Sequence, residues 1–276
     1  MAGNGDNWTR DEHLLAFNLY SKIPFGSIGM HNPQVIALSH LLDRSVGAVS
    51  YKLTNFARLD PALKARGIRG HSHGARGEVD IWEEFSRDPE RLAFESERAL
   101  ATRSGKTIEE TSEIDSRDLP PPGLERDAIV RLRVNQSFFR KRILSAYQYR
   151  CCVTGLSVRP LLVASHIVPW SLDTKNRLNP KNGLCLNALH DRAFDRGLMW
   201  IDDQLKIRFS TALRKERVSA GTDWLLQFEG NALILPGRFA PDMCFLRKHR
   251  ASLTQGPVRF SNRQIGASEP RPSDIH

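Results

Sequence analysis

The feature that most constrains the fold of this chain is a break in its hydrophobic pattern at residues 101–124, ATRSGKTIEETSEIDSRDLPPPGL. The stretch is rich in acids, serines and threonines and ends in a run of prolines, so it lacks the spaced apolar residues that a helix or strand would bury. This composition is typical of a linker with a stiff end. We therefore predict four regions: residues 1–95, a linker at 96–125, a second domain at 126–255, and a flexible tail at 256–276.

The first region is predicted to be helical. Apolar residues recur at helical spacing in 8–22, 32–44 and 45–59, and Thr9, Asn32 and Ser45 are suited to cap these helices. The short turn between the last two gives the outline of a helix-turn-helix unit. In such a DNA-binding unit the basic side chains would contact phosphates and the asparagine an adenine edge; the residues in question are Arg44, Lys52 and Asn55. A plain helical bundle used for dimerisation explains the pattern equally well.

The second domain opens with a predicted basic amphipathic helix at 126–150. Eight basic residues and one acid fall between positions 126 and 159. We expect this helix to hold a nucleic-acid backbone through Arg133, Arg140, Lys141 and Arg142, although a merely solvated helix face is an alternative. The remainder predicts a strand at 160–168, an apolar segment at 184–195, a hairpin at 197–210, a short strand at 231–239 and a helix at 244–253.

The composition favours a partner of opposite charge. There are 40 lysines and arginines against 31 acids, a formal net charge of +9, which suits polyanions such as nucleic acid. No apolar run approaches the roughly 20 residues of a membrane span, and the polar N-terminus lacks the apolar core of a secretion signal. We expect a cytoplasmic protein with no membrane partner. The four cysteines form no C-x-x-C pair, so we expect reduced thiols and no structural zinc.

One constellation of polar residues points to chemistry. His166 ends an apolar run, Asn182 follows in a loop, and His190 and Asp191 come next in a helical segment. A histidine with an aspartate suits a divalent cation such as Mg²⁺, whose other ligands come from water and phosphate oxygens. A second histidine outside the metal shell can act as a base, because its ordinary pKa lies near neutrality. Taken singly, each residue also has a purely structural explanation: a strand-end histidine, a tight turn, and a solvated helix acid.

The segments around these residues are ASHIVPW, RLNPKNGLCL and HDRAFDRGL, preceded by RVNQSFFRKRILSAYQYRCCVTG and followed by ILPGRF and LRKHR. Together they resemble the HNH endonuclease family, in its bacterial restriction-type branch, over about residues 130–250. The resemblance implies an α+β fold, with the helical N-terminal domain joined by the linker to a C-terminal ββα-metal domain.

The resemblance also implies roles for individual residues. His166 matches the general base, Asn182 the residue that orients the loop, and Asp191 the metal ligand, with His190 as a second candidate for ligand or base. The implied cofactor is a divalent metal, Mg²⁺ or Mn²⁺. Ser165 stands where many members of the family carry a metal-binding carboxylate.

The function implied is hydrolysis of DNA phosphodiester bonds in restriction or phage defence. The expected substrate is double-stranded DNA, and a homodimer would supply one nuclease site for each strand. Two alternatives stay open: a DNA-binding regulator whose HNH fold has lost activity, and an RNA-directed nuclease or toxin.

Overall fold

The computed structural model describes residues 7–68, 74–216 and 219–254, so the predicted tail at 256–276 lies outside the described residues. The elements of the N-terminal region are helices, with bounds α1 (Arg10–Lys22), α2 (Pro33–Leu42), α3 (Val46–Ala57), α4 (Pro61–Lys64), α5 (Arg76–Phe85), α6 (Pro89–Ser104) and α7 (Ile108–Thr111). The later elements are α8 (Leu124–Ala146), β1 (Leu162–His166), β2 (Gly183–Asn187), α9 (Ala188–Asp195), β3 (Met199–Ile201), β4 (Ile207–Phe209), α10 (Thr211–Lys215), α11 (Ala220–Leu226) and α12 (Met243–Thr254).

The three predicted N-terminal helices are confirmed, together with their caps. Thr9 and Glu12 form a reciprocal capping box at the start of α1. The side chains of Asn32 and Ser45 accept backbone hydrogen bonds at the starts of α2 and α3. Each cap satisfies N–H groups that the first helical turn leaves unpaired, which is why these local signals locate the helix starts.

The predicted linker is partly helical. Helix α6 continues through its first residues to Ser104, because Ala101 still packs against the core, and it ends at Gly105, whose φ of 65° suits a residue without a side chain. A short helix, α7, and a 3₁₀ turn at Ser116–Asp118 follow. The sequence pattern missed this order because Ser96, Glu97 and Ala101, rather than large apolar residues, are the buried residues of the last turns.

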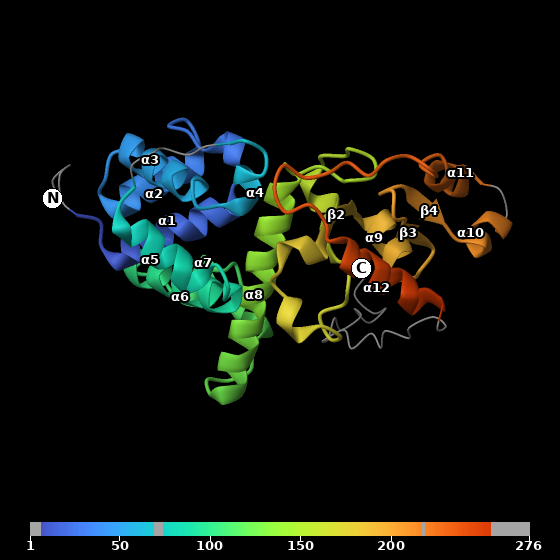
Figure 1. The fold of residues 1–276 in the computed structure, drawn as a ribbon. Helices are drawn as coiled ribbons and strands as arrows, with labels where there is room; N and C mark the ends of the chain where they lie inside the picture. Colours follow the sequence, from blue (N-terminus) through green and yellow to red (C-terminus); the bar gives the residue numbers. More distant parts are fainter. Residues whose placement is uncertain (1–6, 69–73, 217–218, 255–276) are drawn as a thin grey trace, which may run out of the picture.

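Helix α8 stands between the N-terminal helices and the C-terminal strands (Figure 1). It contacts α1 and α6 on one side and β1 and β2 on the other. Phe138, Phe139 and Ile143 bury their side chains along it. Among the described residues, one continuous cluster of buried apolar side chains runs from Leu14 in α1 to Leu246 in α12. The two regions therefore share a core through α8.

The C-terminal region is built on two short antiparallel pairs. β1 pairs with β2, with His166 opposite Gly183, and α9 follows β2 directly, which gives a ββα unit. The predicted hairpin at 197–210 is confirmed as β3 and β4. The predicted strand at 231–239 is wrong. A single bridge joins Lys206 to Ala232, and the chain then leaves the sheet, because the N–H of Ile234 donates to the Cys152 carbonyl outside the strands.

Within the part of the chain that the structure describes, no helix is both long and apolar enough to cross a bilayer. Helix α8, with 23 residues, is the longest of them, and its charged residues are spread along its length.

Candidate active site

The ββα unit places His166 at the end of β1, Asn182 just before β2 and Asp191 on α9. Gly183 lies under α8, and a Cβ atom there would come within 2.8 Å of the Phe139 ring and of Ile143 Cγ1. Only glycine lets β2 approach the helix this closely. At the other end of β2, Asn187 caps α9 by accepting hydrogen bonds from the backbone N–H groups of Leu189 and His190. These two residues fix where the strand begins and where the helix starts.

His166 sits at the end of β1 with its ring held on two sides. The ring stacks on Phe139 with centroids 3.8 Å apart and meets Trp170 edge-on at 5.5 Å. Its Nε2 lies 2.9 Å from the carbonyl oxygen of Arg177. Because a carbonyl only accepts, Nε2 carries the proton in that bond, and Nδ1 keeps a lone pair. Burial lowers the pKa of His166 below 6.5, which keeps the ring neutral near pH 7.

Asn182 fastens the loop that follows β1. Its side chain is fully buried, and its oxygen accepts a hydrogen bond from the Val168 N–H at 2.8 Å. Its amide nitrogen donates to the carbonyls of Val168 at 3.1 Å and Asn176 at 3.4 Å. Asn182 thus links Val168, near the start of the loop between β1 and β2, to Asn176 further along it. The Arg177 carbonyl that binds His166 lies within the same loop.

Asp191 and Asp195 stand four residues apart on α9 and so share one face of the helix. Burial raises the pKa of Asp191, while the nearby Ser165 hydroxyl and Arg192 oppose the rise. The side chain of Asp195 opens to solvent, yet desolvation by the surrounding protein, followed by the charge of Asp191, raises its pKa to about 6. Neither acid forms an ion pair with the described residues. The pair concentrates negative charge on one face of α9, and Arg192 and Arg196 offset it without forming an ion pair.

A cavity of about 240 Å³ contains His166, Asp195 and His249 in its wall. His249 comes from α12 and stacks on Phe194 with centroids 3.8 Å apart. Its Nε2 lies 3.2 Å from the Phe194 carbonyl, which leaves Nδ1 buried without a hydrogen-bond partner. Burial lowers the pKa of His249 to about 4. Two neutral imidazoles and one carboxylate thus line one space, and Asp191 is not among the residues of its wall.

The residues that include this ββα unit match a known protein family. Residues 151–202, which run from before β1 to just after β3, match the family described as HNH endonuclease. These residues are an HNH endonuclease domain. The match takes in His166, Asn182 and Asp191, so the domain holds the three residues that lie around the β1–β2 loop and α9.

A comparison with solved structures finds a distant likeness. A solved structure titled "Modification dependent TagI restriction endonuclease" aligns with 24% sequence identity and a TM-score of 0.32, and the alignment covers 41% of this chain and 36% of that chain. This chain thus spans well under half of that protein. A search of curated proteins returns no match.

His190 occupies a different environment from the one expected. It is fully buried, contacts the rings of Trp224 and Phe228, and does not line the cavity that His166 and Asp195 share. Its Nδ1 lies beside the Asn187 side chain, its Nε2 has no partner, and burial lowers its pKa to about 4. We therefore leave His190 out of the base and ligand set of the HNH domain and assign it to the packing of α9 against α11.

The basic residues of α8 are engaged within the protein. Arg133 contacts Asp118, Lys141 pairs with Glu113 at 3.3 Å, and Arg140 donates to the Leu162 carbonyl at 2.9 Å. Arg142 points into the boundary between the two regions and donates to the Leu178 carbonyl at 3.4 Å. The α8 helix therefore acts first as a packing element for the HNH domain, and its partly exposed cations are at most secondary phosphate contacts.

The three candidate groove residues of the N-terminal region also face inward. Lys52 and Asn55 are 6% and 2% exposed, and both bind the buried Glu78. Arg44 pairs with Glu12 at 3.0 Å and packs on the Trp8 ring. Side chains held this way form a polar centre among α1, α3 and α5. In this conformation they cannot reach a groove, so we do not propose them as DNA contacts.

Sequence reasoning missed two residues of the site. Asp195 was not among the predicted site residues, although its spacing from Asp191 already placed both on one helix face. His249 offered no local signal, because it reaches the cavity only through the packing of α12 on β3 and through its own stacking on Phe194 of α9.

The acids on α9 fit a hard divalent cation better than zinc. The described residues contain no group of three or more histidine, cysteine or acidic side chains placed to hold a metal. Two carboxylates with raised pKa values, in ion-pair contact with no cation of the described residues, suit an ion that takes its other ligands from water and phosphate oxygens.

Proposed function

We propose that this protein is a metal-dependent endonuclease that hydrolyses phosphodiester bonds of DNA. The observation that carries the proposal is the state of His166, whose Nε2 is committed to the Arg177 carbonyl while its ring lines a cavity shared with Asp195. A neutral imidazole with one free lone pair, in the wall of a cavity that the Asp195 carboxylate also lines, is equipped for general-base catalysis.

In the proposed reaction, Nδ1 of His166 takes a proton from a water molecule, and the water oxygen attacks the phosphorus in line with the leaving 3′ oxygen. The Arg177 carbonyl stabilises the imidazolium that forms, since it already accepts the Nε2 proton. Asn182 holds the loop that carries this carbonyl, and Phe139 keeps the ring from turning. Both act as positioning residues.

Asp191 and Asp195 are the proposed ligands of a divalent cation, Mg²⁺ or Mn²⁺. Asp195 extends the ligand set beyond the sequence expectation and supplies a carboxylate that position 165 lacks. When bound, the cation would stabilise the negative charge that develops on the phosphate and on the leaving oxygen. Binding would also offset the desolvation and the repulsion from Asp191 that together raise the pKa of Asp195 to about 6.

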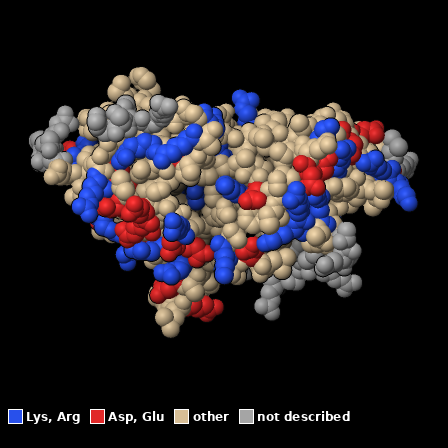
Figure 2. All heavy atoms as spheres, in the orientation of Figure 1, with Lys and Arg blue, Asp and Glu red and all other residues tan. Residues whose placement is uncertain are grey.

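The proposed substrate is double-stranded DNA, and the proposed role is restriction or phage defence by a homodimer. The net charge of +9 supports a polyanionic substrate. Arg196 is a candidate for a phosphate contact, because it lines the same cavity as Asp195 and is exposed. Figure 2 shows lysine and arginine side chains over both halves of the visible face, while the densest acidic group lies over the α5–α6 side.

A plasmid-nicking assay tests the proposal. Wild-type protein is expected to cut in the presence of Mg²⁺ or Mn²⁺, and His166→Ala should lose about 10²–10⁴-fold in rate while still binding DNA. His40→Ala, which changes an exposed histidine on α2, is the matched control and should cut normally.

The same assay separates the alternatives. Absence of metal-dependent cutting on both unmodified and modified DNA, with DNA binding retained, would favour the inactive regulator. Preference for RNA in a parallel digest would favour the RNA-directed nuclease. Cutting that survives His166→Ala would remove the base from the proposal.

A further inference from the structure

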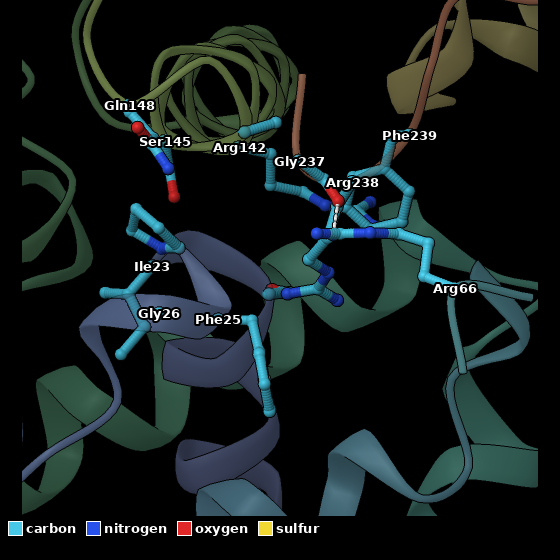
Figure 3. A pocket seen from close by; sticks show the side chains of 13 residues that line it. Ile23, Phe25, Gly26, Arg66, Arg142, Ser145, Gln148, Gly237, Arg238 and Phe239 are labelled. Carbon is cyan, nitrogen blue, oxygen red and sulfur yellow. Dashed lines mark hydrogen bonds between the residues drawn. The ribbon is translucent and has the colours of Figure 1, made fainter. Parts of the chain in front are cut away.

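A second pocket, of about 180 Å³, lies between the N-terminal region and the end of α8. Its walls come from the segment after α1, from Arg66 after α4, from the last turns of α8, and from residues 237–239. In Figure 3 the side chains of Arg66, Arg142 and Arg238 extend toward one another from these separate segments. No acidic side chain is among the described residues that line the pocket.

The three guanidinium groups are opposed by a single carboxylate. Asp60, just behind the pocket wall, accepts hydrogen bonds from Arg238 and from the Tyr20 hydroxyl, both at 2.8 Å. Within the described part of the chain, Arg66 and Arg142 pair with no acid, and their hydrogen bonds go to the backbone carbonyls of Gly237 and Leu178. The site therefore carries an excess of two positive charges.

Hydrogen-bond donors in the site are also left unused. The Nε atoms of Arg142 and Arg238 are buried without a partner, and the Arg238 residue is only 6% exposed. Burial, followed by the charge of Arg238, lowers the pKa of Arg142 to about 9. The centroid of the Phe239 ring lies 5.0 Å from the guanidinium carbon of Arg142 and 4.7 Å from that of Arg238. The ring face offsets only part of their positive charge. Buried cations with spare donors are costly unless an anion joins them.

We propose that this pocket binds a phosphate dianion, either free or as the terminal phosphomonoester of a nucleotide or of a nucleic-acid end. Guanidinium groups match phosphate oxygens in geometry and form strong, charge-assisted hydrogen bonds. The charge of a dianion equals the excess in the site, whereas a phosphodiester within a strand carries one charge and leaves one cation unbalanced. Ser145 and Gln148 on α8 add a hydroxyl and an amide to the same wall.

The pocket is physically linked to the base of the HNH domain, and this part of the inference rests on the proposed function. Arg142 donates to the carbonyl of Leu178, and the preceding carbonyl, that of Arg177, holds His166. An anion that draws Arg142 toward the pocket acts on this loop and changes how firmly His166 is oriented. Phosphate binding is therefore expected to alter the rate of cutting.

Thermal unfolding tests the binding. Wild type, Arg66→Gln and Arg142→Gln are compared in sodium phosphate and in sodium chloride of equal ionic strength. Arg150→Gln is the control, because this exposed arginine follows α8 but does not line the pocket. At 100 times its Kd, phosphate should raise the Tm of wild type and of the control by about 5 °C. Arg66→Gln, at an exposed site and thus safe for folding, should lose most of the rise, as should Arg142→Gln.

An equal rise in all four proteins, or no rise in wild type, would overturn the proposal. Calorimetric titration then distinguishes the sources of the phosphate. A nucleoside 5′-monophosphate should compete with inorganic phosphate while the nucleoside does not. A short oligonucleotide with a 5′-phosphate should bind to the pocket more tightly than the same strand with a 5′-hydroxyl. Equal competition by both strands would mean that the site takes backbone diesters, which contradicts the dianion assignment.

A nicking assay tests the link. Phosphate should change the cutting rate of wild type and Arg150→Gln and leave that of Arg66→Gln unchanged. Binding without any effect on cutting would overturn the link alone. Absence of cutting in every protein would overturn the proposed function while the binding result stands.

Discussion

At the scale of single residues, the environment of each histidine decides its role. His166, His190 and His249 are all buried or half-buried and all have lowered pKa values. They differ in what surrounds the imidazole. The ring of His166 binds a loop carbonyl at the wall of a cavity, whereas that of His190 packs against an aromatic side chain. The order of His166, Asn182 and Asp191 in the sequence was enough to nominate them, but residue order could not tell that His190 turns away from its neighbour Asp191.

The pH dependence of cutting follows from His166. Its neutral form is the one that can accept a proton, and burial shifts its pKa below the usual 6.5. We expect the acid limb of the kcat/KM profile to lie below pH 6.5, with activity kept above it and lost as pH falls through the lowered pKa. An acid limb at or above pH 7, measured with a saturating divalent cation, would contradict the assignment.

The free energy of unfolding should depend on the protonation of His190 between pH 6.5 and about pH 4. Its pKa is about 4 in the folded chain and near 6.5 when unfolded, so the unfolded state binds the proton first. Stability is therefore full above pH 6.5 and falls as pH decreases toward 4, by at most about 1.4 kcal/mol per pH unit for this group. His190→Phe should flatten the dependence of Tm on pH, while the exposed His40→Phe should leave it unchanged.

At the scale of elements, the parts that local chemistry specifies were predictable. Capping residues marked the starts of α1, α2 and α3, and alternating apolar residues marked the hairpin of β3 and β4. The segment at 231–239 was mistaken for a strand because it is apolar, yet Ile234 and Leu235 remain about half exposed. Their environment depends on neighbours distant in sequence, which the pattern does not contain.

The approach of β2 to α8 gives a prediction at this scale. Gly183→Ala would place a methyl group against the Phe139 ring and Ile143. We expect a loss of about 1–3 kcal/mol in the free energy of unfolding, measured with denaturant. Ile143→Ala in the same chain opens space, so a double-mutant cycle should show that the two changes compensate in part. Strictly additive losses would mean that the contact does not limit the packing.

At the scale of the whole molecule, α8 and the segment around Arg238 join two regions that the sequence appeared to separate. Arg238 reaches across to the Tyr20 carbonyl and to Asp60, residues 218 and 178 positions away. No local sequence pattern predicts a contact between residues so far apart in the chain. The predicted linker was read from composition alone, whereas its helical start is held by packing on the shared core.

This arrangement predicts how the molecule unfolds. Since one apolar cluster spans both regions, calorimetry should record a single transition rather than two. Arg238→Ala leaves the buried Asp60 carboxylate without its ion pair and should cost about 3–5 kcal/mol. Combining it with Asp60→Asn should recover part of that loss. Two separate transitions in the wild type would show that the regions fold independently.

The central claim is the division of labour between His166 as base and the two acids of α9 as cation ligands, and calorimetric titration with Mn²⁺ alongside the cutting assay tests it most directly. The account predicts that His166→Ala binds Mn²⁺ about as well as wild type but does not cut. Asp191→Asn and Asp195→Asn should each weaken Mn²⁺ binding, and cutting should return in part at higher metal concentration. Unchanged Mn²⁺ affinity in both aspartate variants, or its loss in His166→Ala, would contradict the account.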